Sequence, residues 1–288
     1  MREELFIISS RRQTEWGFMV ALSTYLLNIG AGLLVAAGQI GYLLGSTLSV
    51  ILMIAGILIL LAHLKRRSRF WRSFMRPSTS WISRGVILIL IAIVLNLLYV
   101  APSYEQFSWL PWTSASVFGR ALLLISTVAA FLVMLYTGFE LADNVSIPFW
   151  NTPLLPILTM LTGLMSGIGI IHISLVGVTL ETANIHFLTS TQLAIILSTL
   201  VVIAVYLLVM SSSNIAAKES VRLLLKGKLS PAFLLGVVTV LIVSLLLTLY
   251  SYLTTLPIPL VVAGVLVIIG GFILRYLIQI AGYHPPLA

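Results

Sequence analysis

Residues 189–211 read TSTQLAIILSTLVVIAVYLLVMS and contain no charged side chain. About 20 apolar residues in a helix cross the hydrocarbon core of a bilayer, which is about 30 Å thick. Runs of the same kind recur along the chain and predict eight transmembrane helices, at approximately 16–42, 44–63, 85–101, 118–143, 152–178, 189–211, 231–253 and 257–281. We therefore expect an all-α, polytopic membrane protein in which the eight helices form two four-helix bundles within a single transmembrane domain, residues 1–288.

The composition excludes a soluble globular protein. Hydrophobic residues make up 60% of the chain and charged residues 8%, whereas soluble proteins carry about 25% charged residues. Cysteine is absent, and iron–sulfur clusters are held mainly by cysteine thiolates. The four histidines, His63, His172, His186 and His284, do not form a facing pair at matching depth in the predicted spans. We expect no iron–sulfur cluster, no haem and no metal site in this chain.

Positive charge orients the predicted bundle. With eight spans, both termini and the loops 64–84, 144–151 and 212–230 share one face, which holds fourteen of the sixteen Lys and Arg residues. Arg120 opens the fourth span at the opposite face, and Arg275 lies within the eighth. We expect the protein to lie in the cell inner or plasma membrane, and the positive-inside rule places the basic face on the cytoplasmic side.

Two interpretations of this basic face stay open. It can serve membrane retention and contact with anionic lipid. The 64–84 loop suggests a role beyond lipid contact, because between His63 and Arg72 cations are interspersed with two large aromatic residues. Such a stretch suits an interfacial turn that packs against a partner protein or over a ligand pocket.

Several polar residues fall inside the predicted membrane near the basic face, where ionisable groups are costly and mark candidate functional sites. Tyr136, Glu140 and Asp143 are spaced by four and three residues and share one helical stripe. Arg275 lies about 9 Å deep from the same face, at 1.5 Å per residue. Further candidates in this half are His63, Ser23 and Tyr25. One interpretation is a structural ion pair between Glu140 and Arg275; the other is a polar pocket for an amphipathic ligand that enters from the membrane.

Three stretches carry a resemblance to a known family. They are His63-Leu64-x-Arg66-x-x-Arg69-Phe70-Trp71, Tyr136-Thr137-Gly138 with Pro148-Phe149-Trp150-Asn151, and Gly271-x-x-x-Arg275-Tyr276. Together they resemble the NrfD-like membrane subunits of polysulfide-reductase type oxidoreductases, which are related to DMSO reductase anchor subunits. Lys65 and Arg67 stand where the family has Gly and Pro.

The resemblance implies a membrane subunit that binds a quinone of menaquinone or ubiquinone type and performs the quinone half-reaction. It also implies a ferredoxin-like iron–sulfur partner joined to a catalytic, often molybdopterin, subunit that holds the main catalytic site. Family members commonly face that partner outward, so the compartment stays open. No nucleic acid partner is expected.

The resemblance also suggests roles for the candidate residues. Glu140 and Asp143 would exchange protons with the quinone, and Tyr136 or His63 would hydrogen-bond a carbonyl. The remaining candidates for cofactor binding are Arg66, Arg69, Ser23, Tyr25, Asn151 and Arg275. The alternative function is a secondary transporter with Glu140 and Arg275 as its coupling site, although the sequence shows no inverted repeat of the kind such proteins have.

Overall fold

The computed structural model describes residues 10–64 and 67–285. In that part of the chain, eight helical spans are long and apolar enough to cross a membrane. They are α1 (Phe18–Gln39), α2 (Leu43–His63), α3 (Trp81–Val100), α4 (Val117–Ala142), α5 (Leu154–Ser174), α6 (Thr182–Ser212), the combined span Ser230–Thr254, and α10 (Pro257–Ile280). The combined span consists of α8 (Ser230–Phe233), the π-helical segment η4 (Leu234–Thr239) and α9 (Val240–Thr254). The predicted all-α, multi-pass membrane fold is confirmed.

The predicted spans differ from the observed helices mainly at the ends. Helix α6 begins at Thr182 rather than at 189, and α3 begins at Trp81 rather than at 85. Ser80 caps α3, because its hydroxyl accepts a hydrogen bond from the Ser83 backbone N–H. Hydropathy reports the part of a helix that lies in the bilayer core, whereas capping residues and polar turns set where the helix begins.

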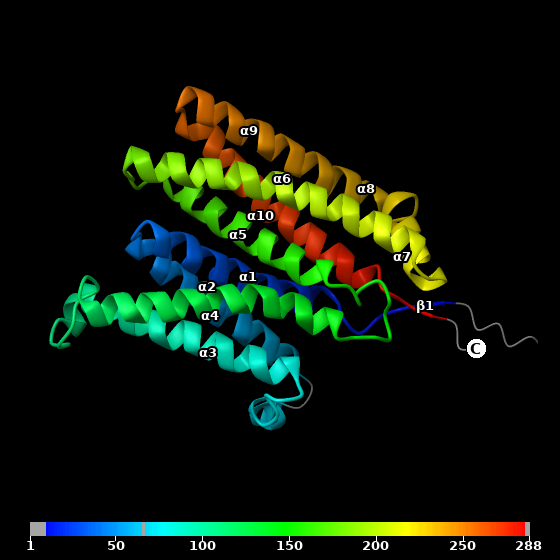
Figure 1. Cartoon of the computed structure of the whole chain (residues 1–288), viewed down its shortest axis with the longest axis horizontal. Coiled ribbons are helices and arrows are strands. Elements are labelled where there is room, and N and C mark those ends of the chain that lie inside the picture. Colours follow the sequence, from blue (N-terminus) through cyan, green and yellow to red (C-terminus); the bar gives the residue numbers. More distant parts are fainter. Residues whose placement is uncertain (1–9, 65–66, 286–288) are drawn as a thin grey trace, which may run out of the picture.

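The helices form two rings of four (Figure 1). In the first bundle α1 contacts α2, α2 contacts α3, α3 contacts α4, and α4 returns to α1. In the second bundle α5, α6, α9 and α10 close in the same way. The bundles meet where α5 packs against α1 and α4. A Cβ atom added to Gly32 of α1 would overlap the Gly163 carbonyl of α5, so small residues allow this close approach.

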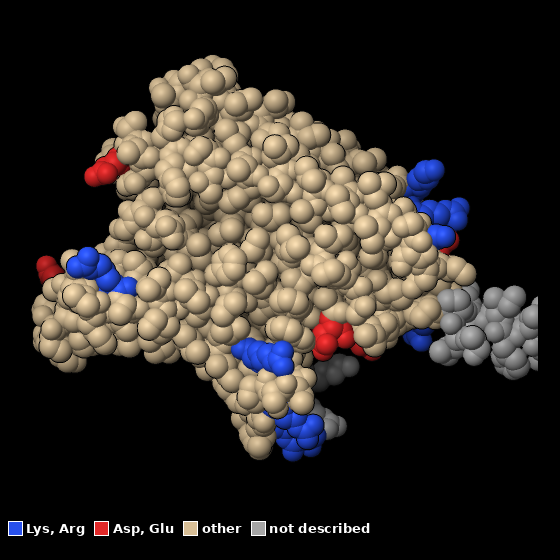
Figure 2. Space-filling model, in the orientation of Figure 1, with Lys and Arg blue, Asp and Glu red and all other residues tan. Residues whose placement is uncertain are grey.

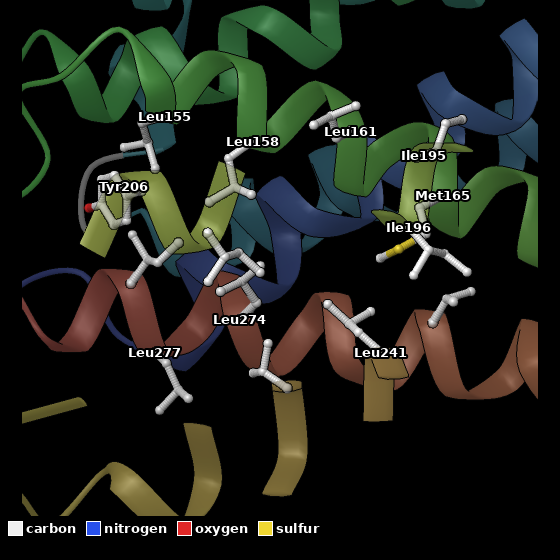
Figure 3. Close-up of a cluster of buried hydrophobic side chains, with 14 of the residues drawn as sticks. Leu155, Leu158, Leu161, Met165, Ile195, Ile196, Tyr206, Leu241, Leu274 and Leu277 are labelled. Atoms are coloured by element: carbon white, nitrogen blue, oxygen red, sulfur yellow. The ribbon is translucent and has the colours of Figure 1, made fainter. Parts of the chain in front are cut away.

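Apolar side chains fill the second bundle. Figure 3 shows side chains from four helices pointing toward one another, among them Leu158 of α5, Ile196 of α6, Leu241 of α9 and Leu274 of α10. Each of these residues is at most 2% exposed. At one end of this cluster the Tyr206 hydroxyl donates a hydrogen bond to the Phe149 carbonyl at 2.6 Å. This tight packing contrasts with the first bundle, which holds a large pocket.

Short elements gather at the end of the molecule where the first and last described segments of the chain meet (Figure 1). Strand β1 (Arg11–Arg12) pairs antiparallel with β2 (Tyr283–His284). The 3-10 helix η1 (Arg67–Phe74) follows α2, and α7 (Ile215–Leu225) follows α6. The opposite end carries two short 3-10 helices, η2 (Ala101–Ser103) and η3 (Glu105–Phe107). As predicted, the described segments nearest the two chain ends lie together on the side of the basic loops. Figure 2 shows most of the visible Lys and Arg side chains at this end and on the projection below it.

Candidate functional site

A pocket of about 460 Å³ lies inside the first bundle, below η1. Its walls come from the segment before α1, from α1 to α4, and from η1, and most of its lining is aliphatic or aromatic. The polar side chains that line it are Glu15, Thr24, His63, Arg69, Ser73, Tyr136 and Glu140. Ligand sites in proteins commonly have volumes of about 300–1,000 Å³, apolar walls and a few polar groups that orient the ligand. The pocket lies where the sequence predicts one, below the 64–84 loop.

The roof of the pocket is tied to the bundle through Arg84. Its guanidinium donates hydrogen bonds to the Pro77 and Ser78 carbonyls at 2.8 and 2.7 Å. The same guanidinium lies 4.6 Å from the Trp81 ring centroid, and Trp81 stacks on Phe139 of α4 at 4.3 Å. Charge, backbone and aromatic contacts therefore hold the end of the 64–84 loop against α3 and α4.

The N-terminal segment forms another wall. The Gln13 side-chain amide donates to the Gln279 carbonyl at 2.8 Å, and the Trp16 ring meets the edge of Trp150 at 5.6 Å between centroids. With the β1–β2 pairing, these contacts hold Glu15 and Trp16 in the pocket lining.

Tyr136 and Glu140 lie one turn apart on α4 and both line the pocket. A Cβ atom on Gly85 of α3 would overlap the Tyr136 ring, so this glycine makes the space in which the ring lies. The Glu140 Oε2 atom is buried and has no hydrogen-bond partner among the described residues. Because an unsatisfied buried carboxyl oxygen is costly, this atom is available to a bound ligand.

Arg275 lies behind the pocket wall rather than in a direct ion pair with Glu140. Its side chain is 6% exposed and donates to the Thr24 hydroxyl at 3.3 Å and to the Thr137 carbonyl at 2.8 Å. Within residues 10–64 and 67–285, the only ion pair joins Arg222 to Glu219. The structural ion pair considered from the sequence is therefore not formed, and Arg275 reaches the pocket through Thr24.

Of the other predicted site residues, His63 and Arg69 line the pocket. Arg66 lies outside the described residues. Ser23 and Tyr25 point elsewhere: the Ser23 hydroxyl donates to the Val20 carbonyl, and the Tyr25 hydroxyl bonds Ser166 and the Ile268 carbonyl at 2.8 and 2.7 Å. Successive helix positions differ by about 100°, so only Thr24 of these three neighbours faces the pocket.

Asn151 and Asp143 also lie outside the pocket lining. The Asn151 side chain donates to the Ala142 carbonyl at 2.7 Å and thereby satisfies the end of α4. Asp143 is the exposed C-cap residue of α4. The helical stripe predicted from Tyr136 to Asp143 therefore leaves the pocket after Glu140, because the helix ends there and the chain turns toward the solvent.

Several residues of the site, Ser73 among them, were not predicted from the sequence, and Thr24, Glu15 and Gly85 show why. Thr24 could have been found, since its spacing of four from Val20 and three from Leu27 puts all three on one helix face, and all three line the pocket. Glu15 comes to the site through the β1–β2 pairing, and Gly85 through its contact with a distant ring. Neither contact leaves a local signal in the sequence.

Comparison with known proteins gives one family. A family model described as "Polysulphide reductase, NrfD" matches residues 7–286. Protein NrfD of Escherichia coli is 32% identical over 188 residues, which are 56% of this chain and 59% of that protein. A sulfite dehydrogenase subunit of Allochromatium vinosum is 31% identical over 48% of this chain and 44% of its own length. A polysulfide reductase subunit of Wolinella succinogenes is 24% identical over 63% of this chain and 66% of its own length. The matches thus span less than two thirds of the length of each relative.

Proposed function

This chain belongs to the polysulphide reductase NrfD family, and on that premise we propose that it is the quinone-reactive membrane subunit of a multisubunit respiratory oxidoreductase in the plasma membrane. The observation that carries the proposal is the pocket below η1. It combines apolar walls with Glu140, whose buried Oε2 atom has no partner in the described part of the chain. Apolar walls suit a flat ring, and the protonated carboxyl of Glu140 can donate a hydrogen bond to a ring carbonyl.

The pocket residues can hold such a ring and supply its protons. A quinone exchanges two electrons and two protons. The His63 imidazole and the Tyr136 hydroxyl, on different walls, can each hydrogen-bond a ring oxygen. Glu140 can take up or release a proton at Oε2, and the exposed Asp143, three residues further on, can pass that proton to the solvent. Arg275 positions Thr24 and places positive charge behind the site.

The outer edge of the pocket supports entry from the membrane. Ile82 and Leu90 of α3 line the pocket and are 49% and 41% exposed on the apolar surface of the bundle. A long isoprenoid tail can therefore stay among the lipid chains while the ring lies under η1. This arrangement avoids moving the tail through water.

The proposed docking of a partner subunit rests on the position of η1 above the pocket. Arg69, Trp71 and Arg72 are exposed on this helix, and Arg69 also lines the pocket. A ferredoxin-like iron–sulfur subunit that docks on η1 would bring its cluster directly above the ring, and a catalytic subunit, of molybdopterin type in our proposal, would join it. Arginine and aromatic residues are the types that are enriched at protein interfaces.

The secondary transporter is the weaker alternative. Such proteins commonly bind substrate and coupling ions where membrane helices are interrupted. Glu140 and Arg275 instead lie within the uninterrupted α-helices α4 and α10. The π-helical segment η4 departs from α-helical geometry, but it lies in the second bundle and away from this pocket.

Gentle purification of the native complex tests this function. We expect an iron–sulfur subunit to co-purify with the wild-type chain. Arg72 and Arg76 are exposed and do not line the pocket, so the double variant Arg72→Glu/Arg76→Glu should insert normally but retain at least about tenfold less partner, because like charges across an interface repel.

The matched control for that experiment is Lys226→Glu/Lys228→Glu, which makes the same change of charge elsewhere on the basic end. It should retain the partner at the wild-type level. Recovery of the wild-type chain as a homo-oligomer without an iron–sulfur subunit would contradict the proposed function.

A further inference from the structure

A second hollow, of about 250 Å³, lies between the end of α6 and the outer face of α7, at the basic end and away from the first pocket. Three cations line it, Lys218, Arg222 and Lys226, together with Ser211 and two apolar side chains, Val221 and Leu225. The cations are spaced by four residues and form one stripe along α7. We propose that this hollow binds the phosphate headgroup of an anionic phospholipid.

Helix α7 is held rigidly enough to present such a stripe. Ala216, Ala217, Ser220, Val221 and Leu224 form its buried face, which packs against α6, α8 and β2. The Asn214 side chain caps the helix by accepting a hydrogen bond from the Ala217 backbone N–H at 2.9 Å. The cationic face is therefore fixed outward by packing on the opposite face. Figure 2 shows Lys and Arg side chains clustered at the end of the molecule where α7 and α8 meet.

The surroundings favour lipid over a water-soluble partner. Ile215 and Leu225 flank the cations on α7 and are 66% and 38% exposed. Exposed apolar residues beside cations on a short helix are typical of helices that lie at the boundary between headgroups and acyl chains. Acyl chains would cover Ile215 and Leu225, whereas a protein that contacts only the cations from the aqueous side would leave both exposed to water.

An apolar track on α6 leads from the membrane to the hollow. Leu197, Val201, Ala204, Leu208 and Ser211 are all exposed. Intervals of four and three residues place them on one face of the helix, over about 21 Å at 1.5 Å per residue. Ser211 lines the hollow itself. A phospholipid can thus lay an acyl tail along α6 while its phosphate meets the three cations.

One acidic group lies near the stripe. Glu219 approaches Arg222 at 3.6 Å, and both side chains are substantially exposed. An exposed pair of this kind contributes little to stability and partly neutralises Arg222. Lys218 and Lys226 have no carboxylate partner among the described residues. These two lysines should therefore supply most of the attraction for a phosphate.

Native mass spectrometry of the delipidated, full-length protein tests the site, with equal amounts of phosphatidylglycerol and phosphatidylcholine offered in mixed micelles. The wild-type protein should retain one phosphatidylglycerol in preference to phosphatidylcholine. Lys218→Gln/Lys226→Gln should reduce that preference by about thirty-fold, because each basic residue near a membrane surface contributes about fivefold and the two factors multiply. Arg11→Gln/Arg76→Gln removes the same charge from exposed positions outside the hollow and should leave the preference unchanged.

Four results would overturn the inference. The first is an unchanged preference in the lysine variant, and the second is an equal loss in the control. The third is that inorganic phosphate alone binds to the lipid-free protein with the same dependence on Lys218 and Lys226, which would make this a site for free phosphate. A lysine variant that keeps its lipid but loses a partner subunit would also count against the proposal, and would assign the stripe to docking.

Discussion

Glu140→Gln is expected to leave the complex assembled and to slow quinone-linked turnover by about 10²-fold or more, the usual loss when a general acid–base group is removed. The substitution keeps the size of the side chain but removes its ability to exchange a proton. Oε2 of this residue is buried and has no protein partner among residues 10–64 and 67–285, so no described hydrogen bond at that atom is broken by the change. Turnover should be measured with a soluble quinol analogue, and assembly by co-purification of the partner.

Two comparisons isolate the role of Glu140. Tyr136→Phe removes one hydroxyl without a change of charge, and we expect a smaller loss of turnover. Glu181→Gln makes the same chemical change to an exposed carboxylate at the other end of the bundle and should have no effect. Full activity in both Glu140→Gln and Tyr136→Phe would place the quinone elsewhere.

A purely electrostatic role for Glu140 predicts a different pattern. If the carboxylate only balances the charge of Arg275, Glu140→Gln should destabilise the bundle by leaving a buried cation uncompensated. The double variant Glu140→Leu/Arg275→Leu should then recover both stability and turnover. On our account the double variant stays inactive, because the proton carrier is missing.

Gly32→Val is expected to prevent stable assembly of the two bundles. The Cβ atom of the new side chain would overlap the Gly163 carbonyl, and in the same contact Gly167 lies against the backbone of Gly32 and Leu33. Rigid backbone cannot move aside as a flexible side chain can, so α1 and α5 would have to separate. We expect a destabilisation of about 3 kcal/mol or more, at the upper end for overpacked cores.

The matched control for this change is Gly177→Val, since a Cβ atom at Gly177 meets nothing within 4 Å. Size-exclusion chromatography in detergent and the thermal unfolding midpoint should show aggregation or a large loss of stability for Gly32→Val alone. A Gly32→Val protein with the wild-type midpoint would show that the α1–α5 contact does not hold the bundles together.

The sequence predicted the fold well because bilayer thickness and charge asymmetry are simple constraints. Apolar length located all eight spans. An even number of spans predicted that the two ends of the chain share a face, where residues 11–12 and 283–284 are paired. Helix ends were less accurate, since α6 extends to Thr182 through a stretch in which Asn184 and His186 interrupt the apolar run. Helix α7 was not predicted, because a short amphipathic helix in a basic loop has no such length signal.

The candidate site could be predicted only in part. His63, Tyr136 and Glu140 were identified because they are polar residues near the ends of predicted helices on the basic face. The structure places all three in one pocket. The rotation of α1 could not be predicted, so Ser23 and Tyr25 were chosen in place of Thr24. Rotation depends on which neighbours a helix meets, and α1 has contacts on several sides. The wall formed by Glu15 depends on pairing between residues 11–12 and 283–284, a contact between the two ends of the chain.

On the function proposed above, the pocket below η1 binds a quinone. Labelling of the intact complex with a photoreactive quinone, followed by mapping of the modified peptides, tests it most directly. We expect adducts on the pocket-lining parts of α2, η1, α3 and α4, within residues 57–90 and 136–140, that disappear when excess unmodified quinone is present. Adducts confined to α6, α9 or α10 of the second bundle, or labelling that unmodified quinone does not reduce, would contradict it.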